Sequence, residues 1–447
     1  MNSAESANQP KTVFDVSHRM VLGLAVPMTL AYLSTPLLGV VDTAVVGQFG
    51  NAALIGGLAV GAIIIDLLFT TFNFLRSGTT GLVSQAFGAG DEKEKQAILF
   101  RALVIAIAAG LIAILLSPLL LELGLWFMNP GNAVSEATSE YFLLRMLSAP
   151  LALGNYVILG WLLGLGKSWK TLALQLLLNG TNIALSIFLG LTLDWGLSGV
   201  AVATIIGEAL AFVVGLMICW RELDHSIRPS KKRLLDSGAL TRLVNLNADI
   251  MIRSFALLFA FAWFTKQGAG FGETILAANA VLMHFFLVAG YFLDGLATAA
   301  EQICGRSIGA NSHSNFWKGF RLTLFWNLVM AVALTSIYLL VGDWMINLMT
   351  TDFQVRSLAN AFLLLAAITP LTGVFAFQLD GVFIGATWSR EMSRMMIISL
   401  ATYFIALWLL KEPYGNIGLW LALHCFLLVR GLTLGLILPY KARAAFS

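Results

Sequence analysis

The chain has 447 residues, of which 58% are hydrophobic and only 11% are charged. Soluble domains carry about 25% charged residues, so this composition excludes an ordinary soluble protein and indicates one with many membrane spans. The net charge of +3 does not point to nucleic acid, and we expect no nucleic-acid partner. No metal-ligand cluster or disulfide spacing is present among the five histidines and three cysteines.

The chain begins with a hydrophilic stretch, MNSAESANQPKTVFDVSHR. It lacks the apolar core and the small-residue cleavage site of a signal peptide. We therefore expect insertion through the first membrane helix, with the amino terminus left in the cytoplasm.

Apolar stretches of about 20 residues, enough to cross the hydrocarbon layer as a helix, occur twelve times. They fall near 18–45, 53–80, 96–117, 136–164, 169–191, 196–219, 243–265, 274–304, 317–341, 356–384, 393–410 and 415–438. Pro27, Pro36, Pro150 and Pro370 lie within them. Proline kinks membrane helices, so these four are predicted conformational hinges.

The positive charges predict the orientation. If alternate loops lie on opposite sides, about 20 of the 27 Lys and Arg residues fall on the side of the termini and about three fall opposite. Basic residues mark cytoplasmic loops. Both termini are therefore predicted to be cytoplasmic.

The two halves of the sequence resemble each other. With a shift of about 221 residues, TTGLVSQAFGAG at 79–90 falls on AEQICGRSIGAN at 300–311, and FLLRMLSAPL at 142–151 falls on FLLLAAITPL at 362–371. Six spans return the chain to its starting side, so the repeat is parallel. The predicted fold is an all-α integral membrane protein with twelve transmembrane helices in two six-helix bundles.

These observations divide the chain into five parts: an N-terminal tail (1–16), a first lobe (17–219), a basic cytoplasmic linker (220–241), a second lobe (242–440) and a C-terminal tail (441–447). Parallel repeats are a transporter architecture, in which the substrate binds between the lobes near the midplane. The alternative is a duplicated scaffold that transports nothing.

Eleven charged side chains lie inside predicted spans. They are Asp42, Asp66, Glu208, Asp249, Asp294, Glu301, Asp380, Arg76, Arg145, Arg253 and Arg430. At about 2.5–3.5 kcal/mol each near a helix centre, lipid-facing placement of all of them would cost on the order of 30 kcal/mol, more than a fold's net stability. Most must face a wet cavity or pair with one another.

Some of these charges have a structural explanation. Asp249 and Arg253 are one helical turn apart, which predicts an ion pair within one helix. Arg76 and Arg145 are predicted to bridge neighbouring helices.

Asp42, in the stretch LGVVDTAVVG at 38–47, has no countercharge three or four positions away on its helix. An apolar environment favours its protonated form. Such an acid can take up and release a proton, or hold a cation when it is ionised, and an isolated intramembrane acid marks a coupling site. The alternative is a protonated acid with a structural hydrogen bond.

The second lobe carries the other acids predicted to line a cavity, Asp294, Glu301 and Asp380. Asn73 occupies the position of Asp294 in the first repeat. Soft, polarizable side chains such as Met283 would complete the wall. Adaptable apolar walls with a few acids suit bulky organic cations.

Four stretches carry a family resemblance: PLLGVVDTAVVG (36–47), FLRSGTTGLVSQAFGAG (74–90), RMLSAPLALGN (145–155) and LDGVFIGAT (379–387). They resemble the multidrug and toxic compound extrusion (MATE) transporters, and most closely the bacterial DinF-like branch. The similarity covers almost the whole chain.

The resemblance implies a secondary active antiporter in a bacterial inner membrane, which exports cationic or amphipathic organic compounds by alternating access of two lobes. It implies no cofactor and a monomer. Asp42 matches the family's first-helix acid, and Pro27 matches the proline at which that helix bends. The ion-coupling site would also include Asn182, Ser186 and Thr204.

Two positions depart from the family. Ser186 stands where many prokaryotic members carry an aspartate, and Leu257 stands near a seventh-helix acid of some sodium-coupled members. Both departures remove an anionic ligand. The expected coupling ion is therefore the proton, with sodium as the alternative.

Two other functions remain open. A flippase for lipids or lipid-linked precursors shares the architecture, but it would need a cationic cavity for phosphate, whereas the interior charges of the second lobe look acidic. An intramembrane enzyme would need a nucleophile–base pair or a metal cluster, and no such motif is present. We therefore expect a transporter, not an enzyme.

Overall fold

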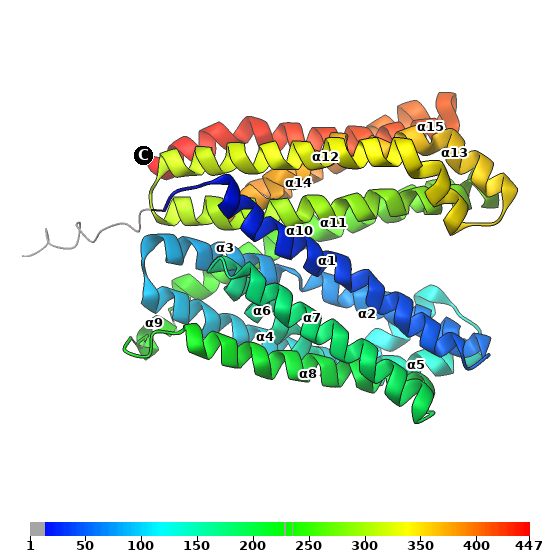
Figure 1. The fold of residues 1–447 in the computed structure, drawn as a ribbon, viewed down its shortest axis with the longest axis horizontal. Helices are drawn as coiled ribbons and strands as arrows, with labels where there is room; N and C mark the ends of the chain where they lie inside the picture. Colours follow the sequence, from blue (N-terminus) through cyan, green and yellow to red (C-terminus); the bar gives the residue numbers. More distant parts are fainter. Residues whose placement is uncertain (1–13, 228, 235) are drawn as a thin grey trace, which may run out of the picture. The chain divides into compact units, whose positions relative to one another are not determined.

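The computed structural model describes residues 14–227, 229–234 and 236–447, with the backbone alone at positions 240 and 242. Within these ranges the regular structure is helical, without β-strands (Figure 1). The helices are α1 (His18–Gly47), α2 (Ala52–Thr71), α3 (Phe74–Ala89), α4 (Glu92–Met128), α5 (Asn132–Met146), α6 (Ala149–Gly164), α7 (Ser168–Leu185), η2 (Ser186–Thr192), α8 (Gly196–Glu222), α9 (Lys231–Leu234), α10 (Ser237–Ala269), α11 (Glu273–Gly309), α12 (His313–Met349), α13 (Phe353–Ala367), α14 (Thr369–Gly385) and α15 (Ser389–Phe446).

The span count agrees with the sequence. In the described part of the chain, nine helical stretches are long and apolar enough to cross a membrane, and two bent pairs of shorter helices also qualify. The twelfth span comes from α15, which consists of two helices joined at Gly415 (φ 54°). This left-handed conformation favours glycine, and the Cβ of an alanine at the nearby Gly418 would overlap with the carbonyl oxygen of Leu410. The prediction of an all-α, twelve-helix membrane protein is confirmed.

Two of the predicted prolines lie at helix breaks. The α5–α6 pair bends by 53° and the α13–α14 pair by 41°, with Pro150 and Pro370 in the first turn of the second helix of each pair. Proline lacks the N–H that would continue the helical bonding. A hydroxyl caps a carbonyl at each break: Ser148 donates to Arg145 O (2.9 Å) and Thr369 to Ala366 O (2.7 Å).

The other two prolines, Pro27 and Pro36, do not interrupt α1, which is assigned as one helix. The chain separates into two compact units. Unit 1 contains residues 1–29, 84–90 and 245–447, and unit 2 contains residues 30–83 and 91–244. One boundary therefore falls inside α1, two residues after Pro27.

The predicted linker and tails are partly helical. The linker contains the short α9 between the ends of α8 and α10, and α15 continues through the predicted C-terminal tail to Phe446. Residues 1–13 of the predicted N-terminal tail lie outside the described residues, whereas Phe14 and Val16 are buried in unit 1.

The core of unit 1 is built around large aromatic side chains. Trp420 packs edge-on against Phe264 with ring centroids 5.1 Å apart. Its indole N–H donates to Asn279 Oδ1 (2.9 Å), and Asn279 also exchanges hydrogen bonds with Asn416. The buried amides thus find partners inside the core, as groups without access to water must.

Candidate functional site

Asp42 lies in the second half of α1, inside unit 2, with only 7% of its surface exposed. The Ser186 hydroxyl donates a hydrogen bond to Asp42 Oδ1 at 2.9 Å. In the described part of the chain, no lysine or arginine forms an ion pair with Asp42. The carboxyl group is therefore held by a neutral donor.

The Ser186 contact is the first link of a buried hydrogen-bond chain. Ser186 Oγ also lies 3.2 Å from Asn182 Oδ1. The Asn182 amide donates to Thr204 Oγ1 (2.6 Å), and the Thr204 hydroxyl donates to Val200 O (3.0 Å). The structure thus brings together all four predicted ion-coupling residues, from α1, α7, η2 and α8.

A π-helix positions Ser186. The α-helix α7 ends at Leu185, and the segment Ser186–Thr192 continues with one extra residue per turn. π-helical turns are rare and are frequently found at functional sites. The sequence pattern did not predict this feature.

Unit 2 also contains a buried ion pair, and its acid is Glu208, not Asp42. Arg145 on α5 binds Glu208 on α8 in a bidentate manner at 2.7 and 3.1 Å, and both side chains are buried. Arg76 on α3 donates to the Tyr32 hydroxyl of α1 at 2.9 Å and to Asn73 at 3.2 Å. The prediction that the two arginines bridge helices is confirmed, and Asn73 contacts one of them.

In unit 1, Asp380 on α14 is clamped by two arginines, Arg253 of α10 and Arg430 of α15, which both donate to its Oδ2. The prediction that Arg253 pairs with Asp249 is wrong. Asp249 instead accepts hydrogen bonds from Ser389 (3.0 Å) and Ser393 (3.4 Å). Arg253 thus pairs with an acid on a neighbouring helix and not with the acid one turn away on its own helix.

The remaining predicted cavity residues lie in different environments. Asp294 and Glu301 are two turns apart on α11, but Asp294 is exposed and Glu301 is buried. Met283 is half-buried and packs against the aromatic core of unit 1.

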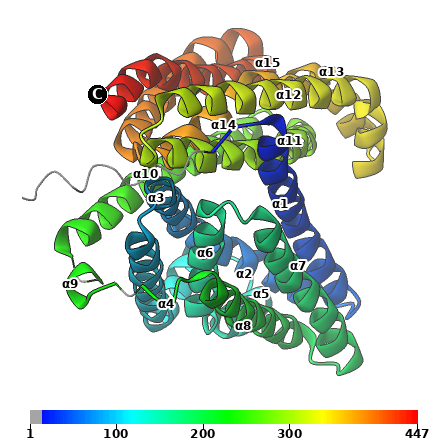
Figure 2. The ribbon, with the colours of Figure 1, turned by 60° about the vertical axis from the view of Figure 1, so that its left-hand side comes forward.

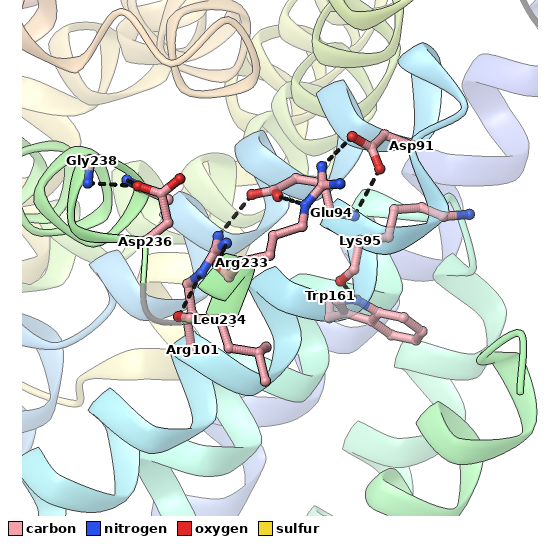
Figure 3. Close-up of polar contacts among 10 residues, drawn as sticks. Asp91, Glu94, Lys95, Arg101, Trp161, Arg233, Leu234, Asp236 and Gly238 are labelled. Carbon is pink, nitrogen blue, oxygen red and sulfur yellow. Dashed lines mark hydrogen bonds and ion pairs between the residues drawn. The ribbon is translucent and has the colours of Figure 1, made fainter. Parts of the chain in front are cut away.

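A second polar cluster, which the sequence analysis missed, ties the linker to unit 2. Arg233 of α9 pairs with Asp91 and with Glu94 (2.9 Å) at the start of α4, and Arg101 of α4 donates to Leu234 O at 3.2 Å (Figure 3). Figure 2 shows α9 beside α4. The hydrogen bond to Glu94, and to a lesser extent the one to Asp91, raises the pKa of Arg233 above its usual value. The only signal in the sequence was the presence of three acids, Asp91, Glu92 and Glu94, and of a separate linker rich in basic residues.

Comparisons with known proteins agree with this architecture. The MatE family model matches residues 27–188 and 250–409. The chain is 38% identical over 423 residues to DNA damage-inducible protein F of Escherichia coli, covering 94% of this chain and 92% of that protein. It is 23% identical to a probable multidrug resistance protein NorM of Bacillus cereus, covering 97% and 95% of the two chains.

Solved structures show the same fold. A MATE crystal structure in the bent conformation superposes with a TM-score of 0.88 at 15% identity, covering 96% of each chain. A MOP superfamily transporter from Pyrococcus furiosus gives a TM-score of 0.85 at 16% identity, covering 96% of this chain and 97% of that one.

The apolar helices and the family match are those of a multi-pass bacterial membrane transporter, not an enzyme. The chain belongs to the MatE family.

Proposed function

We propose that the protein is a secondary active exporter of cationic or amphipathic organic compounds, driven by the inward flow of protons through Asp42. The observation that carries the proposal is the environment of Asp42, which is buried and hydrogen-bonded to Ser186 without an arginine or lysine partner in the described chain. A carboxyl group without a fixed countercharge is free to change its protonation state. Asp380, by contrast, has two arginine partners.

The hydrogen-bond chain supports protons over sodium. Sodium would need several oxygen ligands with compensating negative charge, and Asp42 is the only carboxylate in this set of four side chains. Ser186 supplies a neutral oxygen where a second carboxylate would add charge.

Alternating access requires α1 to change its environment. The boundary between the two compact units crosses α1 close to Pro27, which supports Pro27 as the hinge of this helix. Pro150 and Pro370 sit at breaks that already exist, and we propose that these breaks also flex during transport. Pro36, in the same helix, stays a predicted second hinge of α1.

The proposed substrate class rests on three predicted cavity residues that are not fully buried. Asn73 and Met283 are half-buried, and Asp294 is exposed. Asp294 offers an exposed acid to a cationic group. Asp380 is paired with two arginines and we assign it a structural role, as we do the buried Glu301 of α11.

A flippase for lipids or lipid-linked precursors is the second candidate. The two arginines around Asp380 weaken the sequence argument against it, because the interior of unit 1 carries buried positive as well as negative charge. Movement of a phospholipid is therefore measured alongside transport of an organic cation.

We further propose that the protein is a monomer in the inner membrane with both termini in the cytoplasm.

The test uses full-length protein in liposomes loaded with ethidium as the organic cation, with proton and sodium gradients imposed separately. We expect transport to follow the proton gradient in the parent and to fall at least about tenfold in Asp42→Asn, which cannot ionise. The control Asp343→Asn removes an exposed acid and should leave transport unchanged.

Two results would overturn the proposal. One is full proton-driven ethidium transport by Asp42→Asn. The other is a parent protein that moves a fluorescent phospholipid between leaflets but not ethidium, which would make it a flippase.

A further inference from the structure

The ends of α3 and α11 cross at unusually close range inside unit 1. A Cβ on Gly88 would overlap with the carbonyl oxygen of Arg306, and a Cβ on Gly309 would overlap with that of Gln85. These two contacts are reciprocal, because the repeat pairs Gly88 with Gly309 and Gln85 with Arg306. Only glycine allows backbones to approach this closely.

The crossing is asymmetric in its side chains. The Gln85 amide donates to Gly385 O (3.0 Å) and to the Thr387 hydroxyl (3.2 Å). The Arg306 guanidinium instead lies over two aromatic rings, 4.1 Å from the centroid of Phe14 and 4.5 Å from that of Phe87. Arginine between aromatic faces is stabilised by cation–π attraction, most strongly when desolvated.

Phe14 belongs to the short segment that precedes α1. Together with the first residue of α1, this segment forms residues 14–18, which make three contacts with α12: Asn315 donates to Phe14 O (2.8 Å), Lys318 pairs with Asp15 (2.6 Å), and the Trp326 indole N–H donates to His18 (3.1 Å). Phe14 and Val16 are buried. The segment therefore contacts the crossing through Phe14 and is held in place by α12.

We propose that residues 14–18 form a latch that keeps the end of α3 crossed against α11. The Arg306 guanidinium holds the latch closed through its contacts with the rings of Phe14 and Phe87. The remainder of α3, before residue 84, belongs to unit 2. Opening of the crossing is therefore the separation of residues 84–90 from α11 within unit 1. The latch sets how often that happens, and it does so independently of the coupling ion.

The test measures opening through Ser84→Cys, introduced into a chain whose Cys219, Cys304 and Cys425 are replaced by alanine. Ser84 is fully buried, and its side chain meets Gly305 at the crossing. The rate of labelling by a water-soluble maleimide, measured on the full-length protein in detergent, reports how often the crossing opens.

We expect Phe14→Ala and Arg306→Gln each to raise the labelling rate about fivefold or more, as expected for the loss of a desolvated cation–π contact. Phe14→Tyr keeps the ring and should label at the parent rate. Asp15→Asn is the matched control, because its ion pair with Lys318 is exposed and exposed pairs contribute little.

A second route tests the crossing itself. Gly88→Ala should raise labelling because its methyl group would push α3 away from Arg306, whereas Gly23→Ala, with open space around its Cβ, should not. A cysteine at the fully buried Ser399 of α15 must stay slow in every variant, which separates opening from unfolding.

Parent-like labelling in both Phe14→Ala and Arg306→Gln would overturn the latch. So would an equal rise in Asp15→Asn, or a parallel rise at the Ser399 reporter.

Discussion

The Ser186 hydroxyl has a single proton and two acceptors within reach, Asp42 Oδ1 at 2.9 Å and Asn182 Oδ1 at 3.2 Å. When Asp42 is ionised, the proton belongs on the Asp42 side. When Asp42 is protonated it can itself donate to Ser186, whose proton then turns to Asn182. A change in the protonation state of Asp42 would therefore redirect the Ser186 proton to Asn182 of α7, while the bond from the Asn182 amide to Thr204 of α8 stays as it is.

This arrangement predicts the effect of Ser186→Asp. A second carboxylate beside Asp42 adds the negative charge that a cation site needs, so we expect sodium to bind at least about tenfold more tightly, a change of about 1.4 kcal/mol. A sodium gradient alone should then drive ethidium transport. Ser186→Asn, which adds a similar volume without charge, is the control and should remain insensitive to sodium.

Sequence reasoning at this scale succeeded and failed for identifiable reasons. Asp42, Asn182, Ser186 and Thr204 were grouped through the family resemblance, because residues 140 positions apart carry no local signal of contact. The Asp249–Arg253 pair was predicted from spacing and is wrong. Spacing within one helix cannot reveal an acid such as Asp380 on another helix.

At the scale of helices, α5 and α8 are joined by the buried pair of Arg145 and Glu208. Arg145 also donates to the Ser148 hydroxyl at 2.5 Å, so one guanidinium serves both the neighbouring helix and the break before α6. Its loss would leave a buried carboxylate without a partner, which costs far more than the pair itself contributes.

We therefore expect Arg145→Met to destabilise the protein by about 3–5 kcal/mol. The double variant Arg145→Met with Glu208→Leu should recover most of that loss, since a well-packed apolar pair replaces the ions. Thermal unfolding in detergent measures both. A double variant as unstable as the single one would show that the pair is not the interaction that holds α5 to α8.

The breaks and the π-helix differ in how visible they are in a sequence. Pro150 and Pro370 predicted the two bends because a missing N–H acts locally. The π-helical turn at Ser186 has no such marker: its extra residue is stabilised by packing against other helices. The latch segment was assigned to a tail because Phe14 follows a hydrophilic stretch, and its partner Arg306 lies almost 300 residues away.

For the whole molecule, the repeat predicted twelve spans and the parallel duplication, because the hydrophobic pattern and six-span period act over the entire chain. The orientation rests on a different property, the uneven distribution of lysine and arginine. About 20 of the 27 lie at one end of the predicted topology. That end includes α9 with Lys231, Lys232 and Arg233, and the carboxyl end of α15.

This asymmetry predicts that the carboxyl terminus faces the cytoplasm. A green fluorescent protein fused after Ser447 should fluoresce, and alkaline phosphatase at the same position should be inactive, because that enzyme needs export to form its disulfides. Phosphatase fused after Thr351, in the connection between α12 and α13, should be active and serves as the matched control. The reverse pattern would place the basic loops outside, and the proton-driven direction of export proposed for Asp42 would then have to be inverted.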